Sequence, residues 1–238
     1  LLILLAISLP ALLGMSWLTL LVPVTTPARR AVIVGNGILL GLIVLPLIMR
    51  LLDALGAGLN FPPTVAVCGV LILVAGLMRV VLKQGRGLKP APVSGYRALS
   101  TGQKALFLMF LLLSVSHVII PALELLSRPL FPWDATMHWA TKSRVWFEYG
   151  QMVPFVDKSH WLEMEGVGVF TDHHPNYPTT IPLLQVWMNS AIGRWDESLM
   201  NLPWVLCFIG LGTAFYGQAR VAGIGEILSI AFTYLLLS

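Results

Sequence analysis

Residues 105–126, ALFLMFLLLSVSHVIIPALELL, form an apolar run of 22 residues in which Glu124 is the one Asp, Glu, Lys or Arg. A helix needs about 20 predominantly apolar residues to cross the hydrocarbon core of a bilayer. Within lipid, a helix also satisfies its backbone hydrogen bonds internally. The run therefore predicts a transmembrane helix, and it decides the fold class.

Similar runs lie on both sides of this one. They occupy residues 1–22, 31–49, 61–82, 179–193, 199–219 and 222–238. The run 179–193 is short and contains Gln185 and Asn189, so its limits as a span are ill-defined. We predict an all-α fold, a polytopic transmembrane helical bundle integral to the membrane.

The composition excludes other classes of protein. Of the 238 residues, 57% are hydrophobic and 11% are charged, with a mean hydropathy of +0.82. Soluble domains are typically about 25% charged, so a water-soluble globule, a disordered chain and a disulfide-stapled module are all excluded. Cys68 and Cys207 lie in apolar runs, with neither metal nor disulfide spacing.

The basic residues predict the orientation. Between residues 79 and 104 the chain carries basic side chains and no acidic one: Arg79, Lys83, Arg86, Lys89, Arg97 and Lys104. Cytoplasmic loops carry an excess of Lys and Arg, and Arg29 and Arg30 fall on the same side. The net charge of +4 thus reflects orientation, and we expect no nucleic-acid partner. The segment 127–178 is then extracytoplasmic, and periplasmic in the bacterial inner membrane that we expect.

The ends of the chain predict a fragment of a longer protein. Leu1 is not Met, and Ser238 ends an apolar run. We expect residues 1–104 to form three N-terminal transmembrane helices and a basic cytoplasmic loop. Residues 105–238 are expected to form a partial catalytic module, cut short at its C-terminal end.

The outer segment concentrates the chemically useful side chains. Residues 128–197 hold eight of the eleven Asp and Glu residues, four of the five His and six of the eight Trp. Residues 131–150 have helical periodicity. One arc of the wheel is mainly apolar, with Trp133, Thr136, Met137, Trp139, Ala140, Trp146 and Phe147; the opposite arc holds Asp134, His138, Thr141, Lys142 and Glu148. This pattern predicts a helix lying in the membrane interface.

Asp134 stands at the start of that helix, directly after Pro132 and Trp133. One interpretation is an N-cap or first-turn acid favoured by the helix dipole. The other is a carboxylate at the membrane surface that acts as a general base. His138 follows one turn later and could orient Asp134.

Further candidates follow along the segment. Asp172, His173 and His174 could bind a divalent metal ion, although adjacent His side chains rarely point the same way; we predict no cofactor, with a metal as the open alternative. Phosphate could be held by Lys142, Arg144, Lys158 and His160, or these could contact lipid phosphates. Sugar rings could stack on Trp161, Trp187 and Trp195, or these could be membrane anchors.

The order of these motifs resembles a known family. Pro-Trp-Asp134-Ala follows a span, with Trp139 and Lys142 after it. His174-Pro-Asn-Tyr177-Pro opens the next apolar run, and Gly193-Arg-Trp-Asp-Glu197 precedes Leu-Pro. Residues 128–220 thereby resemble the N-terminal catalytic module of GT-C membrane glycosyltransferases, especially the bacterial relatives of dolichyl-phosphate-mannose protein mannosyltransferases and of the lipid A aminoarabinose transferase.

The resemblance implies a cell-envelope transferase. Its donor is a hexose or pentose on a polyprenyl phosphate, and its acceptor is a lipid, glycan or protein hydroxyl. Asp134 matches the catalytic base. The matching positions for substrate binding are His174, Tyr177 and Glu197, and His138, Lys142 and Arg144 are added as further candidates.

Two other classes remain open on the residues alone. A transporter or flippase would place ionisable groups at mid-membrane depth. A non-catalytic assembly subunit would use the outer segment to dock a partner.

Overall fold

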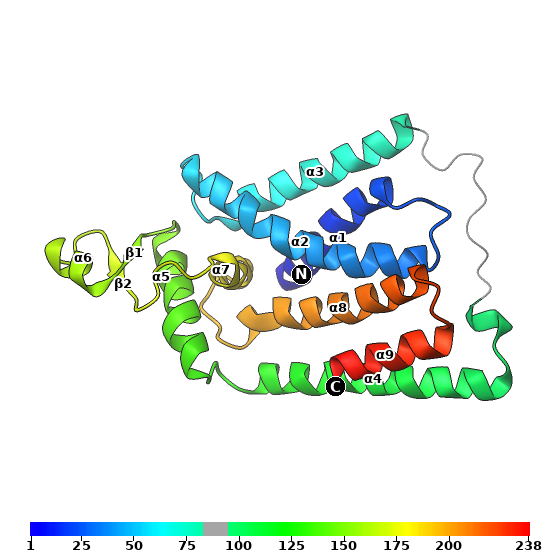
Figure 1. The fold of residues 1–238 in the computed structure, drawn as a ribbon. Coiled ribbons are helices and arrows are strands. Elements are labelled where there is room, and N and C mark those ends of the chain that lie inside the picture. Colours follow the sequence, from blue (N-terminus) through cyan, green and yellow to red (C-terminus); the bar gives the residue numbers. More distant parts are fainter. Residues whose placement is uncertain (83–94) are drawn as a thin grey trace.

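The computed structural model describes residues 1–82 and 95–238, and nearly all of its regular structure is helical (Figure 1). In chain order the elements are α1 (Leu2–Leu21), α2 (Arg29–Ala54), α3 (Phe61–Val81), η1 (Tyr96–Ala98), α4 (Thr101–Ser127), η2 (Ala135–Ala140), α5 (Thr141–Tyr149), β1 (Phe155–Val156), α6 (Lys158–Glu163), β2 (Phe170–Thr171), α7 (Thr180–Ile192), η3 (Leu199–Asn201), α8 (Leu202–Val221) and α9 (Glu226–Leu237). The two strands pair in parallel.

Within the described residues, five helical segments are long and apolar enough to cross a membrane. They are α1, α2, α3, α4 and the continuous segment Leu199–Val221, made of η3 and α8. The chain is thus an integral membrane protein by the length and composition of its helices. The helix α9 is apolar but has 12 residues.

The run 179–193 is not a span. It forms α7, whose 13 residues extend over about 20 Å at 1.5 Å per residue. Figure 1 looks along α7, so this helix crosses the direction of the long helices. Every residue from Pro182 to Asn189 is buried. A helix that is apolar on all sides is covered by protein or by lipid, and here protein covers it.

Glycine allows α1, α2 and α8 to pack closely. An added Cβ at Gly41 of α2 would lie 1.7 Å from the Pro10 carbonyl oxygen of α1. One at Gly35 would lie 2.1 Å from the Ala214 backbone nitrogen of α8. Small residues let membrane helices bring their backbones together in this way.

The helix α4 is packed much less closely. It begins with a capping box, in which Ser100 and Gln103 bond each other's backbone, and it lies along α8 and α9 (Figure 1). Ser114 is its one buried residue. The rest of α4 is half-buried or exposed.

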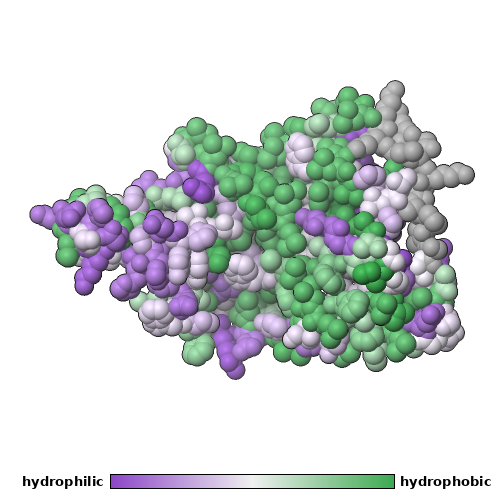
Figure 2. Space-filling view, viewed as in Figure 1, coloured by the Kyte–Doolittle hydropathy of each residue, from purple (hydrophilic) through white to green (hydrophobic). Residues whose placement is uncertain are grey.

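The two ends of the long helices differ in polarity. The start of α2, the end of α3 and the start of α4 share one end, which carries Arg29, Arg79 and Lys104. Lys83, Arg86 and Lys89 lie outside the described residues. The opposite end carries α5, α6 and both strands, and Figure 2 shows hydrophilic residues gathered there. The described basic residues and the polar segment thus lie at opposite ends of the long helices, whereas the side of the membrane that each end faces stays a prediction.

Candidate functional site

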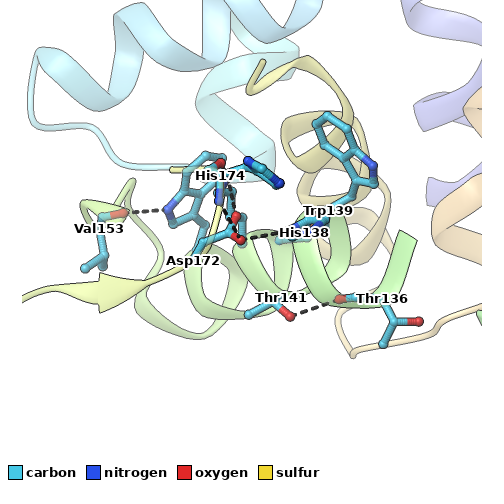
Figure 3. Close-up of polar contacts among 10 residues, drawn as sticks. Thr136, His138, Trp139, Thr141, Val153, Asp172 and His174 are labelled. Carbon is cyan, nitrogen blue, oxygen red and sulfur yellow. Dashed lines mark hydrogen bonds and ion pairs between the residues drawn. The ribbon is translucent and has the colours of Figure 1, made fainter. Parts of the chain in front are cut away.

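A buried cluster of charges holds the polar segment together. The Asp172 carboxylate accepts a hydrogen bond from His138 Nδ1 at 2.7 Å and pairs with Lys142 Nζ, also at 2.7 Å (Figure 3). Lys142 Nζ donates to the His174 carbonyl oxygen at 2.8 Å, and the His174 backbone N–H donates to Asp172 at 3.2 Å. The side chains of His138, Lys142 and Asp172 are all at least 94% buried. Buried charges need this degree of pairing.

The ionised state of Asp172 follows from its donors. Burial raises the pKa of this carboxyl. The hydrogen bonds from Lys142, His138 and the His174 backbone lower the pKa by more than burial raises it, so the pKa lies below its ordinary value. An ionised carboxylate can only accept hydrogen bonds, so His138 Nδ1 must be the donor.

The helical wheel was wrong about the face that His138 and Lys142 occupy. We expected both to face outward with Asp134, but both are buried, whereas Trp133 and Met137 are 64% and 48% exposed. Residues 135–140 form a π-helix, in which the i→i+5 hydrogen bond changes the register that an α-helical wheel assumes. Trp146 and Ala140, which we expected on the apolar arc of an interfacial helix, are buried within the protein.

The stack of rings beside this cluster joins two elements. Tyr177 stacks on His174 with ring centroids 4.5 Å apart, and on Trp139 at 5.2 Å. The His138 ring meets His174 edge-on at 5.0 Å. The motif at residues 174–178 and the helix predicted over residues 131–150 therefore meet at one place.

Asp134 is exposed and stands outside the cluster. Its side chain makes no capping hydrogen bond. Asp134 does lie in the first turn of the helix, as the interpretation of a first-turn acid favoured by the helix dipole expects. Among residues 1–82 and 95–238, no group pairs with its carboxylate. His138, expected to orient Asp134, bonds Asp172 instead.

A cavity of about 480 Å³ is lined by residues on both sides of Asp134 in the sequence, although not by Asp134 itself. Its lining includes Pro132 and Ala135, which flank Asp134 two residues before and one residue after. The polar and aromatic part of the lining consists of Glu124, Arg128, Trp139, Gln185, Asn201 and Trp204. Its size is typical of small-molecule sites.

Buried amides form one wall of this cavity. Gln185 accepts from the Ser143 hydroxyl at 2.5 Å and donates to Asn201 Oδ1 at 3.1 Å. Asn201 Nδ2 donates to the Glu197 carbonyl oxygen at 2.7 Å. Gln185 is 2% exposed and Asn201 is 6% exposed. This network fixes their orientation toward the cavity.

Arg128 and Glu124 form the cavity's charged rim. Their side chains pair at 3.2 Å, one turn apart at the end of α4, and are 70% and 62% exposed. An exposed pair of this kind contributes little to stability, so both groups are free to exchange partners with a ligand.

The turn after α7 has the expected shape. Gly193 ends the helix in the left-handed region with a φ of 77°. Asp196 accepts from the backbone N–H groups of Ser198 and Leu199, and the Leu199 bond is the main cause of a lowered pKa at Asp196. Glu197 is exposed and accepts from the Trp195 indole at 3.4 Å.

The phosphate candidates are placed very differently. Arg144 is exposed, pairs with Glu148 at 3.0 Å and lies over the Trp195 ring at 5.1 Å. Lys142 is 1% exposed, and a phosphate would have to replace Asp172 to reach its ammonium group.

Three other candidates lie away from the cavity. Lys158 and His160 belong to the short helix α6, whose first turn is capped by Asp157. The indole of Trp187 is buried and donates to the Ala6 carbonyl oxygen.

The proposed metal ligands do not converge. In the part of the chain that the structure describes, no three His, Cys, Asp or Glu side chains could hold a metal ion together. Asp172 faces Lys142 and His138, while His173 is exposed.

The sequence did not identify the cavity residues as a group. Gln185 was noted only as a polar residue in an apolar run, and Glu124 only as a charge near the end of a span. Amides within an apolar helix are a usable signal, because a buried amide needs hydrogen-bond partners. Asn201 and Trp204 gave no such signal. Comparisons of the chain with known protein families, curated proteins and solved structures give no match.

Proposed function

We propose that this chain is the membrane-embedded part of a glycosyltransferase that moves a sugar from a polyprenyl phosphate to an acceptor hydroxyl, with Asp134 as the general base. One observation carries the proposal: an exposed carboxylate with no partner in residues 1–82 and 95–238, flanked in the sequence by lining residues of a cavity whose wall combines apolar side chains with charged and amide groups. A general base must be able to reach the proton that it removes.

The reaction assigned to this site is a single displacement. Asp134 takes the proton of the acceptor hydroxyl while that oxygen attacks the anomeric carbon. The bond from this carbon to the phosphate oxygen breaks, and the polyprenyl phosphate leaves with the electron pair. The anomeric configuration inverts.

The departing phosphate needs cationic stabilisation. Arg128 on the cavity rim supports this role, because its exposed guanidinium has one exposed partner, Glu124. Arg144 is a second exposed cation, one helix further on. Lys142 is less suited, because Asp172 already neutralises it.

The polar and aromatic lining fits a sugar. Carboxylate and amide groups of Glu124, Gln185 and Asn201 can exchange hydrogen bonds with hydroxyls. The rings of Trp139 and Trp204 can cover an apolar sugar face, as aromatic residues do in binding sites.

The same proposal places the polar end outside. Lys and Arg gather at the far end of the long helices, and cytoplasmic loops are the ones enriched in them. The cavity then opens at the periplasmic surface of a bacterial inner membrane, where the polyprenyl-phosphate sugar would present its sugar.

Replacing Asp134 tests the function. In membranes containing the full-length protein, D134N should lower transfer of radiolabelled sugar from polyprenyl phosphate by about 10²–10⁴-fold, the usual contribution of a general base. The matched control is E148Q, an exposed acid on the same stretch of helix, which should keep wild-type transfer. Normal transfer by D134N would refute the proposal.

We favour transfer over transport because the polar side chains converge at one end of the helices. A transporter would be indicated if proteoliposomes took up a sugar without forming a glycosidic product. An assembly subunit would be indicated if the protein co-purified with a partner whose activity ignored D134N.

A further inference from the structure

A second cavity continues the first along the same pair of helices. It has a volume of about 550 Å³ and lies between α4, α8 and α9. Helix α4 runs antiparallel to α8 (Figure 1), so the end of α4 faces the start of α8. The polar cavity uses Arg128 and Trp204 at that end, and the second cavity uses Val115 and Thr213 further along. We call the two cavities together the α4–α8 seam.

One stripe of α4 lines the whole seam. Positions 107, 111, 114 and 118 line the second cavity, and positions 121, 125 and 128 line the first. The spacing alternates between four and three residues, which keeps all seven positions on one face of the helix. The two cavities are therefore successive parts of one lengthwise feature.

The chemistry changes along the seam. The second cavity is apolar, apart from hydroxyl groups such as those of Ser114 and Thr233. Both hydroxyls already donate to the backbone one turn earlier in their own helices. The first cavity carries the charges and amides. A ligand that fits both has an apolar chain and a polar head.

The seam is open along one side in the part of the chain that the structure describes. Val115, Ile119 and Ile209 line it and are 42%, 49% and 40% exposed. Three half-exposed apolar side chains at membrane depth leave an open crevice between spanning helices rather than a sealed core. A ligand can enter it sideways from the lipid.

We propose that the α4–α8 seam binds the acceptor, and that this acceptor is a membrane lipid with a hydroxyl-bearing phosphate headgroup. The proposal rests on the proposed function. The acceptor must present its hydroxyl to the base, and the polar cavity is the one whose lining flanks Asp134. In this arrangement Arg128 supplies a cation for the headgroup phosphate, and the departing phosphate of the donor is left to Arg144, the second exposed cation. The apolar cavity takes one chain of the lipid.

The group transfer then balances within the membrane. The lipid hydroxyl loses its proton to Asp134, and its oxygen forms the new bond to the anomeric carbon. The polyprenyl phosphate of the donor leaves with the electron pair of the broken bond. The products are a glycosylated lipid and a polyprenyl phosphate.

Lipid binding is tested first, without catalysis. Phosphatidylglycerol is added to the delipidated full-length protein, and bound lipid is measured by native mass spectrometry. V115W and I119W fill the apolar cavity, and each should lower lipid occupancy at least tenfold. I120W is the matched control, since Ile120 is 64% exposed on α4 and does not line the seam. D134N should bind as wild type does.

Equal occupancy in wild type, V115W, I119W and I120W would overturn the seam as a binding site. If V115W or I119W fails to fold, as judged by gel filtration, the lipid occupancy of the other variant still tests whether the seam binds lipid.

The product then separates this inference from the proposed function. In membranes, radiolabelled sugar should appear in an organic-extractable phospholipid, and V115W should lose that product while I120W keeps it. Label in protein or in water-soluble glycan would overturn the lipid acceptor and leave the transferase standing. No Asp134-dependent transfer to any acceptor would refute the proposed function itself.

Discussion

The α1–α2–α8 bundle and the polar segment 133–179 are held together by opposite means. In the bundle, Gly41 and Gly35 have no side chain, and this allows the helix backbones to come into contact. The polar segment uses charged side chains, with Asp172 holding His138 and Lys142. Packing of the first kind is indifferent to pH, whereas the second depends on the ionisation of one carboxyl. The polar cavity lies where α4, α7 and α8 meet the polar segment.

The largest effect is expected at the charge cluster. D172N removes the anion and leaves the Lys142 ammonium buried without a counter-ion. Breaking a buried pair in this way costs about 3–5 kcal/mol. Denaturant unfolding of the purified protein, followed by tryptophan fluorescence, should show it. The control is D157N on the exposed α6 cap, which should leave unfolding unchanged. An unchanged D172N would mean that the cluster does not hold the segment.

The next effect is expected in the bundle. G41A places a Cβ against the Pro10 carbonyl, so α1 and α2 must move apart. Overpacking of this kind typically costs about 1–3 kcal/mol. G69A in α3 is the matched control, because a Cβ there meets nothing within 4 Å. Equal thermal stability of the two variants would contradict the close packing.

Acid should separate the two regions. The pKa of Asp172 is lowered in the folded protein, so its stabilising contribution is complete above the ordinary Asp pKa near ~4 and is lost as pH falls through the folded value. Stability should therefore fall in acid, by less than D172N costs, because protonated Asp172 keeps some hydrogen bonds. D172N should lack this part of the acid dependence. Identical pH profiles would contradict the assignment.

The smallest effect is expected at the exposed ion pairs. The Arg144 and Glu148 side chains pair at 3.0 Å but are each 53% exposed. Such surface pairs contribute about 0.2–1 kcal/mol. R144A should thus change the unfolding free energy by no more than this, and added salt should remove the difference. A loss as large as that of D172N would show that α5 depends on its surface charges.

The sequence predicted the long helices because their apolar length alone distinguishes them. It misjudged α7, since an apolar run looks the same whether lipid or protein covers it. Buried Gln185 is explained by its hydrogen bonds with Ser143 and Asn201. Buried Asn189 is explained by its hydrogen bonds with Met200 and with the Asp196 backbone N–H. The sequence of a single apolar run shows none of these partners.

The candidate site was predicted by residue type more successfully than by partner. Asp172, His138 and Lys142 were all singled out, but as a metal ligand, an orienting group and a phosphate ligand. Their actual partners lie 30 or more residues apart in the sequence, and the π-helix turns His138 inward. The periodicity of a short stretch of sequence predicts neither these distant partners nor the π-helix.

The central claim is that Asp134 removes the proton of the acceptor. Azide is an anionic nucleophile that needs no proton removed, so it bypasses a missing base. Full-length D134A is supplied with the cell's own polyprenyl-phosphate sugars and with azide, and glycosyl azide is measured by mass spectrometry. We predict no transfer to the natural acceptor but formation of glycosyl azide with inverted configuration. Normal transfer to the natural acceptor, or loss of both products, would contradict the role of Asp134 as the base.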